Sequence, residues 1–499
     1  MTYTVVIGLD GAGFELLEPW LNAGELPNLR RVVNGGVAGD LRSVLPPVTS
    51  PNWKAYATGK NPGKLGVFWW YNVDTEEERV YLPNDRYHDH DEYWELLADR
   101  ERVGVLGVPT TYPPKSASEF VVSGAPDADA TGFTNPPSLE TELREEFDYR
   151  PTTRKSLKSG DDAAYEEVLD HVDTQFEVGK YLRETRDLSL LQLTTFYVNA
   201  LHHHRWDGEY SLRAWKIIDD HLGDFLDDGA NVVLMSDHGH AEIERVFYVN
   251  TWLQREGYLS FDAPVASTLH SAGVTADRLN EMLASVDGRL PFDVQAAAAR
   301  LAPGAVVDRL PNDRGEVGRG KIDTANWERT RAVASAQGPV YLAVDGLERE
   351  RVRDELLRKL STLETPDGRP VAKAVYRGDE VYDGPYADEW PAVVVDKAPD
   401  VHVSDKVGGD QVFARKHDVW NGVNTRAGLF AATGPAFTTG DVDGLSILDL
   451  APTLLHMHDE PIPRDLDGCV RPEVFAEGSG PRTREVTYRD AQRTRTDGG

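Results

Sequence analysis

Short apolar runs alternate with longer amphipathic stretches over the first half of the chain. The apolar runs have the length and β-branched content of buried strands, and they lie at 4–9, 103–108, 120–123, 189–197 and 231–236. Apolar residues recur at helical spacing over 91–100, 162–184 and 210–226. This alternation predicts an α/β fold, with a doubly wound, mostly parallel sheet and helices on both of its faces.

The pattern changes in the second half of the chain. Residues 262–320 are rich in Ala and Asp, with helical periodicity over 275–286 and 294–301, and we interpret them as a small inserted cap. Sheet-like segments return at 332–344, 391–395 and 428–432, and 447–455 is predicted to be a last helix. The polar residues 479–499 are predicted to form a flexible tail, so that residues 1–499 make one domain with an insertion.

The charge balance is strongly acidic. Lys and Arg number 53 against 83 Asp and Glu, which gives a formal net charge of -30. This charge repels nucleic acid and anionic membranes, and the sequence has no basic patch to offset it, so we expect neither as a partner. Only 14 of the basic residues are Lys, a balance that resembles halophilic proteins, in which salt screens the self-repulsion. An ordinary acidic protein is the alternative.

Cysteine content and apolar run length limit the class of protein further. Cys469 is the only cysteine, which excludes an intramolecular disulfide and a thiolate metal cluster. Any metal ligands are therefore expected to be mainly His and carboxylate. The first predicted strand follows Met1 directly, and no apolar stretch approaches the ~20 residues that span a bilayer. We expect a soluble, cytoplasmic protein whose oligomeric state the sequence leaves open.

Two of the predicted strands end in residues suited to metal binding. The run Thr4-Val-Val-Ile-Gly-Leu-Asp10 ends in a carboxylate, and Val232-Val-Leu-Met-Ser-Asp-His-Gly239 ends in Asp237 and His238. In open α/β sheets ligands bind outside the carboxyl ends of the strands, so these side chains are predicted to face a ligand. For either Asp alone, an ordinary helix N-cap is the alternative.

Two further segments carry candidate chemistry. Pro46-Pro-Val-Thr-Ser-Pro-Asn-Trp53 holds hydroxyls in a proline-rich turn before a helical stretch, where a nucleophile would face an anion at the helix N-terminus. A bound cation would lower the pKa of such a hydroxyl, although a capped turn explains the same residues. The segment Asn199-Ala-Leu-His-His-His-Arg-Trp206 can offer imidazole nitrogens to a metal, and a solvated loop is the alternative for His202 and His204.

The chain resembles the alkaline phosphatase superfamily, and within it the type I phosphodiesterase and nucleotide pyrophosphatase branch. The matching segments fall in order along nearly the whole chain, the stretch 262–320 excepted. They are Gly8-Leu-Asp10-Gly, Leu26-Pro-Asn-Leu29, Pro46 to Trp53, Thr58-Gly-Lys-Asn-Pro-Gly63, Val108-Pro-Thr-Thr-Tyr-Pro-Pro114, Ser236-Asp-His-Gly239, Gly434-Pro435 and Asp449-Leu-Ala-Pro-Thr453.

The resemblance implies an alkaline phosphatase-like catalytic domain that uses two divalent metals, zinc or manganese, in phosphoryl transfer. It assigns one metal to Asp10, Asp237, His238 and the hydroxyl of Thr49. It makes Thr49 the nucleophile, which forms a phospho-threonine, with the neighbouring Ser50 as the second choice. Asn52 matches the residue that donates a hydrogen bond to the phosphate.

The sequence departs from the family pattern at the second metal. Relatives carry Asp-x-x-x-His after the middle strand and a later His, whereas this chain has Asn199 with His203, and Asn424. Amide oxygens bring no charge, so this second site is expected to be weaker, and His417 is a candidate for the missing nitrogen. The family's His in a Pro-Gly-Lys-His-Gly pattern, which is not a metal ligand, is Leu65 here.

The first hypothesis is therefore a metal-dependent phosphoesterase that hydrolyses phosphodiester or nucleotide-type substrates. The alternatives are a degenerate member that binds a phosphorylated ligand with one metal and little turnover, and a phosphonate hydrolase or phosphotransferase. A sulfatase is not expected, because its Cys/Ser-x-Pro-x-Arg pattern is Thr49-Ser-Pro-Asn-Trp53 here. The aromatic run Phe68-Trp-Trp-Tyr71 either stacks on the organic part of the substrate or packs in the core.

Overall fold

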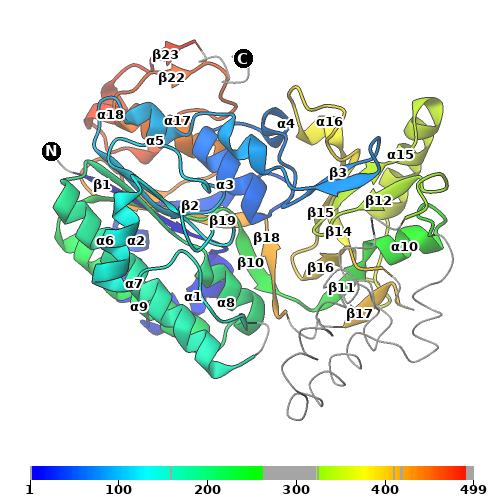
Figure 1. Ribbon diagram of the computed structural model, residues 1–499, viewed down its shortest axis with the longest axis horizontal. Helices are drawn as coiled ribbons and strands as arrows, with labels where there is room; N and C mark the ends of the chain where they lie inside the picture. The colour runs from blue at the N-terminus through cyan, green and yellow to red at the C-terminus, as the bar shows by residue number, and fades with distance from the viewer. Residues whose placement is uncertain are drawn as a thin grey trace, which may run out of the picture.

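The computed structural model describes residues 3–157, 160–261, 322, 325–407, 411–415 and 420–490. This part of the chain forms a large lobe around a long central sheet and a smaller lobe built on two short sheets (Figure 1). The predicted cap at 262–320, with its two helical stretches, lies outside the described residues.

The large lobe is built on a ten-stranded sheet whose middle strands are parallel. β1 (Thr4–Leu9) lies between β8 (Leu190–Thr195) and β9 (Asn231–Met235) and pairs in parallel with both. β5 (Val103–Val108) and β6 (Phe120–Ser123) continue the parallel part beyond β8. These five strands are the ones that the apolar runs predict, and the mostly parallel α/β sheet is confirmed.

The sheet becomes antiparallel beyond β9. β19 (Ala427–Thr433), predicted as a strand at 428–432, pairs antiparallel with β9 and with β2 (Val37–Arg42). The short strands β20 (Gly440–Asp441) and β21 (Leu445–Ser446) pair with β2, and β7 (Thr134–Asn135) pairs with β6 at the opposite edge.

Helices cover both faces of this sheet, as predicted (Figure 1). Side chains alternate along β1, so Val5 and Ile7 belong to one hydrophobic core and Val6 belongs to the other. The first core is covered by α1 (Phe14–Ala23), α2 (Pro27–Gly35), α6 (Ser138–Phe147), α7 (Asp162–Arg186), α8 (Tyr197–Arg205) and α9 (Glu209–Asp227). The second is covered by α3 (Thr49–Thr58), α5 (Tyr93–Leu97) and α17 (Leu450–Met457).

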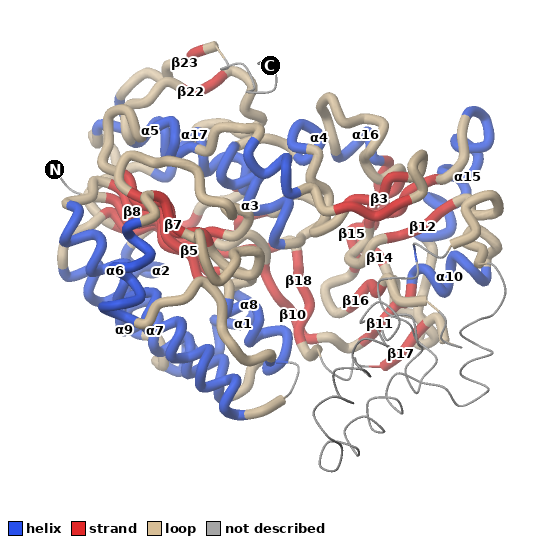
Figure 2. Tube along the Cα trace, in the orientation of Figure 1, coloured by secondary structure: helices blue, strands red, loops and turns tan. Residues whose placement is uncertain are grey.

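The smaller lobe comes from the chain between β10 (Gly239–Glu242) and β18 (Gly422–Thr425), which pair antiparallel where the chain crosses between the lobes (Figure 2). Its four-stranded sheet runs in the order β12 (Ala332–Ala334), β13 (Pro339–Leu342), β15 (Val393–Lys397) and β14 (Ala372–Arg377). Its three-stranded sheet contains β16 (Val401–Ser404), β11 (Arg245–Tyr248) and β17 (Phe413–Arg415). The helices of this lobe are α10 (Val249–Arg255), α15 (Gly346–Ser361) and α16 (Gly378–Val381).

The remaining elements are short. They are α4 (Pro62–Leu65), α18 (Gly480–Thr483), the pairs β3 (Asn72–Asp74) with β4 (Arg79–Tyr81) and β22 (Ile462–Pro463) with β23 (Tyr488–Arg489), and 3-10 helices at Asn84–His88, Ile447–Asp449 and Pro472–Val474. Residues 491–499 of the predicted tail lie outside the described residues. No helix in the described ranges is both long and apolar enough to cross a membrane.

Gly8, near the end of β1, allows an aromatic side chain of α3 to pack directly on the strand. A Cβ atom at Gly8 would lie 2.5 Å from Thr194 Oγ1 and 2.5 Å from Trp53 Cη2. Trp53 is fully buried, and its indole N–H donates to Asp10 Oδ2 over 2.8 Å. The missing side chain at residue 8 thus lets Trp53 reach the carboxylate at the end of β1.

Gly8→Ala is expected to lower the free energy of unfolding by about 1–3 kcal/mol, because the added methyl overpacks this contact. Gly35→Ala is a matched control, since nothing lies within 4 Å of a Cβ built there, and it is expected to be neutral or to stabilise by about 0.4–1 kcal/mol. Urea unfolding of both variants measures the difference. Equal effects of the two substitutions would contradict the close packing described for Gly8.

Candidate active site

The ends of β1 and β9 bring three potential metal ligands together. The two strands are parallel neighbours with Gly8 opposite Met235, and Asp10 and Asp237 each lie two residues further on. Asp10, Asp237 and His238 are fully buried, and one ligand atom from each lies within 4.8 Å of the other two. The structure therefore brings together the three residues that the strand ends predict.

Neighbouring groups hold these side chains in place. The backbone N–H of Gly11 donates to Asp237 Oδ1 over 3.1 Å, while Asp237 Oδ2 is buried and accepts no hydrogen bond from the described residues. His238 Nδ1 lies 2.9 Å from the carbonyl oxygen of Gly239, which assigns the ring proton to Nδ1. Nε2 then carries the lone pair, which accepts from Asn424 Nδ2 over 3.0 Å, and it lies 3.3 Å from Asp237 Oδ2 and 3.7 Å from Asp10 Oδ1.

Thr49 is the first residue of α3 and faces the same group. Its Oγ1 lies 3.5 Å from Asp10 Oδ1 and 3.4 Å from His238 Nε2. The N–H groups of Thr49 and Ser50 at the start of this helix have no intrahelical acceptor and can attract an anion, whereas Pro51 has no N–H and the Asn52 N–H donates to the Val48 carbonyl oxygen over 3.2 Å. Ser50, the alternative nucleophile, is fully buried, with its Oγ 2.9 Å from Tyr87 Oη.

Asn52 supports the turn that carries Thr49. Its Oδ1 accepts from the Val44 N–H over 2.8 Å, and its Nδ2 donates to the carbonyl oxygens of Pro46 and Val48 over 3.0 and 2.9 Å. The side chain is fully buried. These bonds engage the Asn52 amide with backbone, so its predicted contact with phosphate stays a prediction.

The charges of this group fit a divalent cation. Burial raises the pKa of Asp10 well above its ordinary value, with a further contribution from Asp237, and burial raises the pKa of Asp237 to about 8. Burial lowers the pKa of His238 to about 3, so its imidazole is neutral at pH 7. No Lys or Arg in the described ranges forms an ion pair with either carboxylate, and two carboxylate oxygens, an imidazole nitrogen and a hydroxyl are ligands that zinc and manganese accept.

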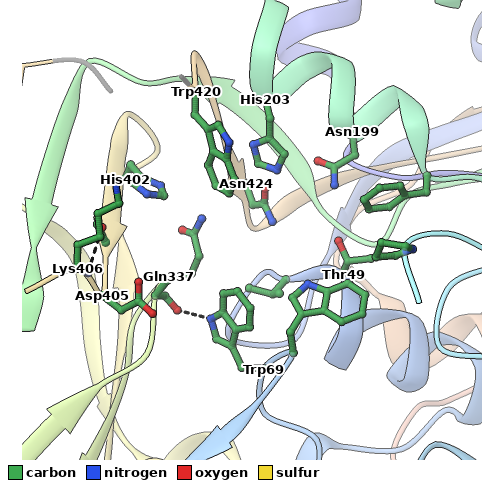
Figure 3. A pocket seen from close by; sticks show the side chains of 16 residues that line it. Thr49, Trp69, Asn199, His203, Gln337, His402, Asp405, Lys406, Trp420 and Asn424 are labelled. Carbon is green, nitrogen blue, oxygen red and sulfur yellow. Dashed lines mark hydrogen bonds between the residues drawn. The ribbon is translucent and has the colours of Figure 1, made fainter. Parts of the chain in front are cut away.

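The second predicted group adjoins the first, because Asn424 Nδ2 lies 3.0 Å from His238 Nε2. Asn199 and His203 are one turn apart on α8, and Asn424 is in β18 (Figure 3). His203 Nδ1 lies 2.8 Å from the carbonyl oxygen of Gly422, and Oδ1 of both Asn199 and Asn424 is buried without a partner among the described residues. Because His203 Nδ1 donates to that carbonyl oxygen, the atoms that can ligate a cation are His203 Nε2 and the two amide oxygens, and the group contains no carboxylate. His417, the predicted substitute, lies outside the described residues.

Two nearby residues were not predicted from the sequence. His240 is buried opposite Asn424 in the β10–β18 pair, and its Nε2 lies 3.3 Å from His203 Nδ1. Its place two residues after His238 was the signal that could have found it. Lys397, at the end of β15 in the smaller lobe, donates to the Asn424 carbonyl oxygen over 2.6 Å, and burial lowers its pKa to about 7.

A pocket of about 470 Å³ opens at Thr49 between the two lobes (Figure 3). Its lining is mainly aromatic and polar, with Trp69, Trp70, Phe196, Asn199, His203, Gln337, His402, Asp405, Lys406, Trp420 and Asn424 among its residues. The residues of the aromatic run 68–71 have different environments. Phe68 is fully buried in a hydrophobic core, whereas Trp69 and Trp70 line the pocket. Leu65 is buried and lies outside this lining.

The solved structures most similar to this one include phosphoester and phosphonate hydrolases. Phosphonoacetate hydrolase from Sinorhizobium meliloti 1021, in complex with phosphonoformate, has a TM-score of 0.54 at 16% identity, over 90% of this chain and 94% of that one. Human ectonucleotide pyrophosphatase/phosphodiesterase 5 has a TM-score of 0.50 at 14% identity, over 92% of this chain and 95% of that one. These likenesses define an alkaline phosphatase-like α/β fold.

The sequence itself defines the family. The profile of the type I phosphodiesterase/nucleotide pyrophosphatase family matches residues 4–422. The chain therefore belongs to this family and is a phosphoric ester hydrolase of the alkaline phosphatase superfamily. A comparison with curated proteins finds no match.

The raised pKa values predict how pH and metal change stability. Without metal, the folded protein binds more protons at Asp10 and Asp237 than the unfolded chain does, so the free energy of unfolding falls as pH rises from about 4 to about 8. A divalent cation held at this site would bind the deprotonated carboxylates, and at 100 times its Kd it is expected to add ~2.7 kcal/mol. Manganese or zinc should therefore raise the Tm of EDTA-treated protein more at about pH 8 than at about pH 5.

Asp237→Asn removes one of the two carboxylates and should reduce both the pH dependence and the metal effect. Asp207→Asn, at an exposed position, serves as the matched control and should change neither. Thermal unfolding at both pH values, with and without metal, makes the comparison. A metal effect that is the same in Asp237→Asn and in the unmodified protein would contradict the assignment of Asp237 as a ligand.

Proposed function

We propose that this phosphoric ester hydrolase cleaves phosphodiester or nucleotide-type substrates with Thr49 as its nucleophile. The observation that carries the proposal is the position of the Thr49 hydroxyl. It is at the N-terminus of α3, within 3.5 Å of Asp10 and His238, and it faces a pocket large enough for an organic ester group.

In the proposed reaction, Thr49 Oγ1 attacks the phosphorus atom and the bond from phosphorus to the leaving-group oxygen breaks. The Thr49 proton leaves toward Asp10 Oδ1, its acceptor at 3.5 Å, and the leaving group takes up a proton from solvent. Water then attacks phosphorus in the phospho-threonine and gives one proton to solvent, the bond to Oγ1 breaks, and Thr49 regains its proton from Asp10. The N–H groups of Thr49 and Ser50, the first two residues of α3, hold the negative oxygens throughout.

The ligand set of Asp10, Asp237, His238 and Thr49 fits one divalent cation, and we propose zinc or manganese. When bound, such a cation lowers the pKa of a hydroxyl ligand and offsets charge on the phosphoryl group. Trp53 and Gly11 would hold the two carboxylates in position for it, because each already donates to one carboxylate oxygen.

A second candidate function follows from the neutral amides of the second predicted group. Asn199 and Asn424 supply amide oxygens where relatives carry a carboxylate and an imidazole, so a second cation would be held weakly. The second candidate is thus a protein that binds a phosphorylated ligand with one metal and turns it over slowly. Phosphonates are a further substrate class to include in the assays.

Thr49→Ala is expected to lower kcat on bis(4-nitrophenyl) phosphate by at least about 100-fold, equivalent to ~2.7 kcal/mol of activation free energy. Thr49→Ser keeps a hydroxyl and should retain part of the activity. Ser50→Ala is the matched control and should retain most of it, because Ser50 Oγ bonds to Tyr87 rather than facing Asp10. Equal activity of Thr49→Ala and the unmodified enzyme would remove Thr49 from the mechanism.

The double variant Asn199→Asp with Asn424→His tests the second site. The added charge and imidazole should tighten a second divalent ion by about 10–100-fold and raise kcat/KM at low metal concentration. Calorimetric titration of the metal-free protein counts the ions and gives their affinities. Two tight ions in the unmodified protein would contradict the weakness of this site, and one ion without turnover would favour the second candidate function.

A further inference from the structure

One polar side chain in the pocket is held in an unusual backbone conformation. Gln337 lies in the turn between β12 and β13 and has φ of 68°, in the left-handed region that glycine favours. The next residue, Gly338, also has positive φ, and the Gln337 N–H donates to the Val403 carbonyl oxygen over 3.0 Å. Non-glycine residues in such conformations are concentrated at active sites and ligand-binding sites.

The Gln337 side chain is buried but incompletely bonded. Only 4% of the residue is exposed, and Oε1 has no hydrogen-bond partner in the described part of the protein. Figure 3 shows its amide group directed into the space between Trp420 and Trp69. A buried acceptor without a partner is unfavourable unless a ligand supplies the donor.

Hydrogen bonds between the lobes support the turn that carries Gln337. The Trp69 indole N–H donates to the carbonyl oxygen of Ala336, the residue before Gln337, so the turn is tied to the aromatic wall of the large lobe. The Tyr71 hydroxyl donates to Asp405 of the smaller lobe in the same region. Gln337 is thus presented on a supported turn, in a pocket that opens at Thr49.

We propose that Gln337 is a specificity-determining residue of this enzyme. It accepts a hydrogen bond from an N–H or O–H group on a ring in the organic part of the substrate, while Trp69 and Trp420 provide apolar surface for the ring. A nucleobase and a sugar both supply this chemistry. The inference rests on the proposed function, because it concerns the ester group of the phosphodiester that Thr49 attacks.

Three diesters test the proposal. Bis(4-nitrophenyl) phosphate has rings without a donor, whereas the 4-nitrophenyl esters of thymidine 5′-monophosphate and of glucose 6-phosphate carry a nucleobase and a sugar. Gln337→Leu should lower kcat/KM for one of the donor-bearing esters at least about tenfold more than for bis(4-nitrophenyl) phosphate. Gln254→Leu, at an exposed amide of α10, is the control and should leave this ratio unchanged.

Gln337→Gly separates recognition from structural support. Glycine adopts φ near 68° without strain, so the Tm of Gln337→Gly should not fall. Its kcat/KM for the donor-bearing ester should nevertheless fall as selectively as that of Gln337→Leu. An equal loss on all three esters, or selectivity that follows a fall in Tm, would overturn the proposal.

Binding to the Thr49→Ala protein keeps this test separate from the proposed function. Thymidine 5′-monophosphate and glucose 6-phosphate are titrated while tryptophan fluorescence is recorded, and Gln337→Leu should raise the Kd of one of them at least about tenfold. The rise in Kd is expected even if the enzyme hydrolyses no diester. Absence of hydrolysis would contradict the proposed function but not the role of Gln337 in binding. An unchanged Kd for both ligands would overturn the role of Gln337.

Discussion

Two carboxylates share one buried site at the end of the central sheet, and the rest of the structure depends on which group neutralises their negative charge. Asp10 and Asp237 have no exposed surface, and their only imidazole neighbour within ion-pair distance in the described ranges, His238, is neutral at pH 7. Burying uncompensated charge costs several kcal/mol per ion, so the ordinary alternatives are protonation or a bound cation. The hydroxyl of Thr49 beside this pair favours the cation, because phosphoryl transfer uses the same arrangement.

The fold places this buried pair beside a pocket that both lobes line. The parallel register of β1 and β9 brings the carboxylates together, and α3 adds the hydroxyl over them. The chain then leaves the sheet at β10 and returns at β18, so the smaller lobe is joined to the large one immediately after Asp237 and His238. This connection explains why Gln337 and Lys397, both from the smaller lobe, lie close to residues of the large one.

Much of the large lobe could be predicted from the sequence because its middle strands are mostly apolar runs, and two of them, β1 and β9, are followed within one or two residues by potential metal ligands. Asp10, Asp237 and His238 followed from that pattern. The antiparallel direction of β19 could not be predicted, since an apolar run has no direction, and the prediction at 189–197 ran past Thr195, where β8 ends and α8 soon begins. His240, Lys397 and Gln337 depend on long-range pairing, and single side chains in a turn or at a strand end carry little periodic signal.

Anomalous diffraction from crystals grown with manganese or zinc would test the central claim most directly. The account predicts a strong peak within ~2.0–2.3 Å of one oxygen each from Asp10 and Asp237 and of His238 Nε2, with Thr49 Oγ1 in contact and a weaker peak or none near His203. A well-ordered crystal at saturating metal with no peak among these residues, and with the two carboxylates within hydrogen-bond distance of each other instead, would contradict it.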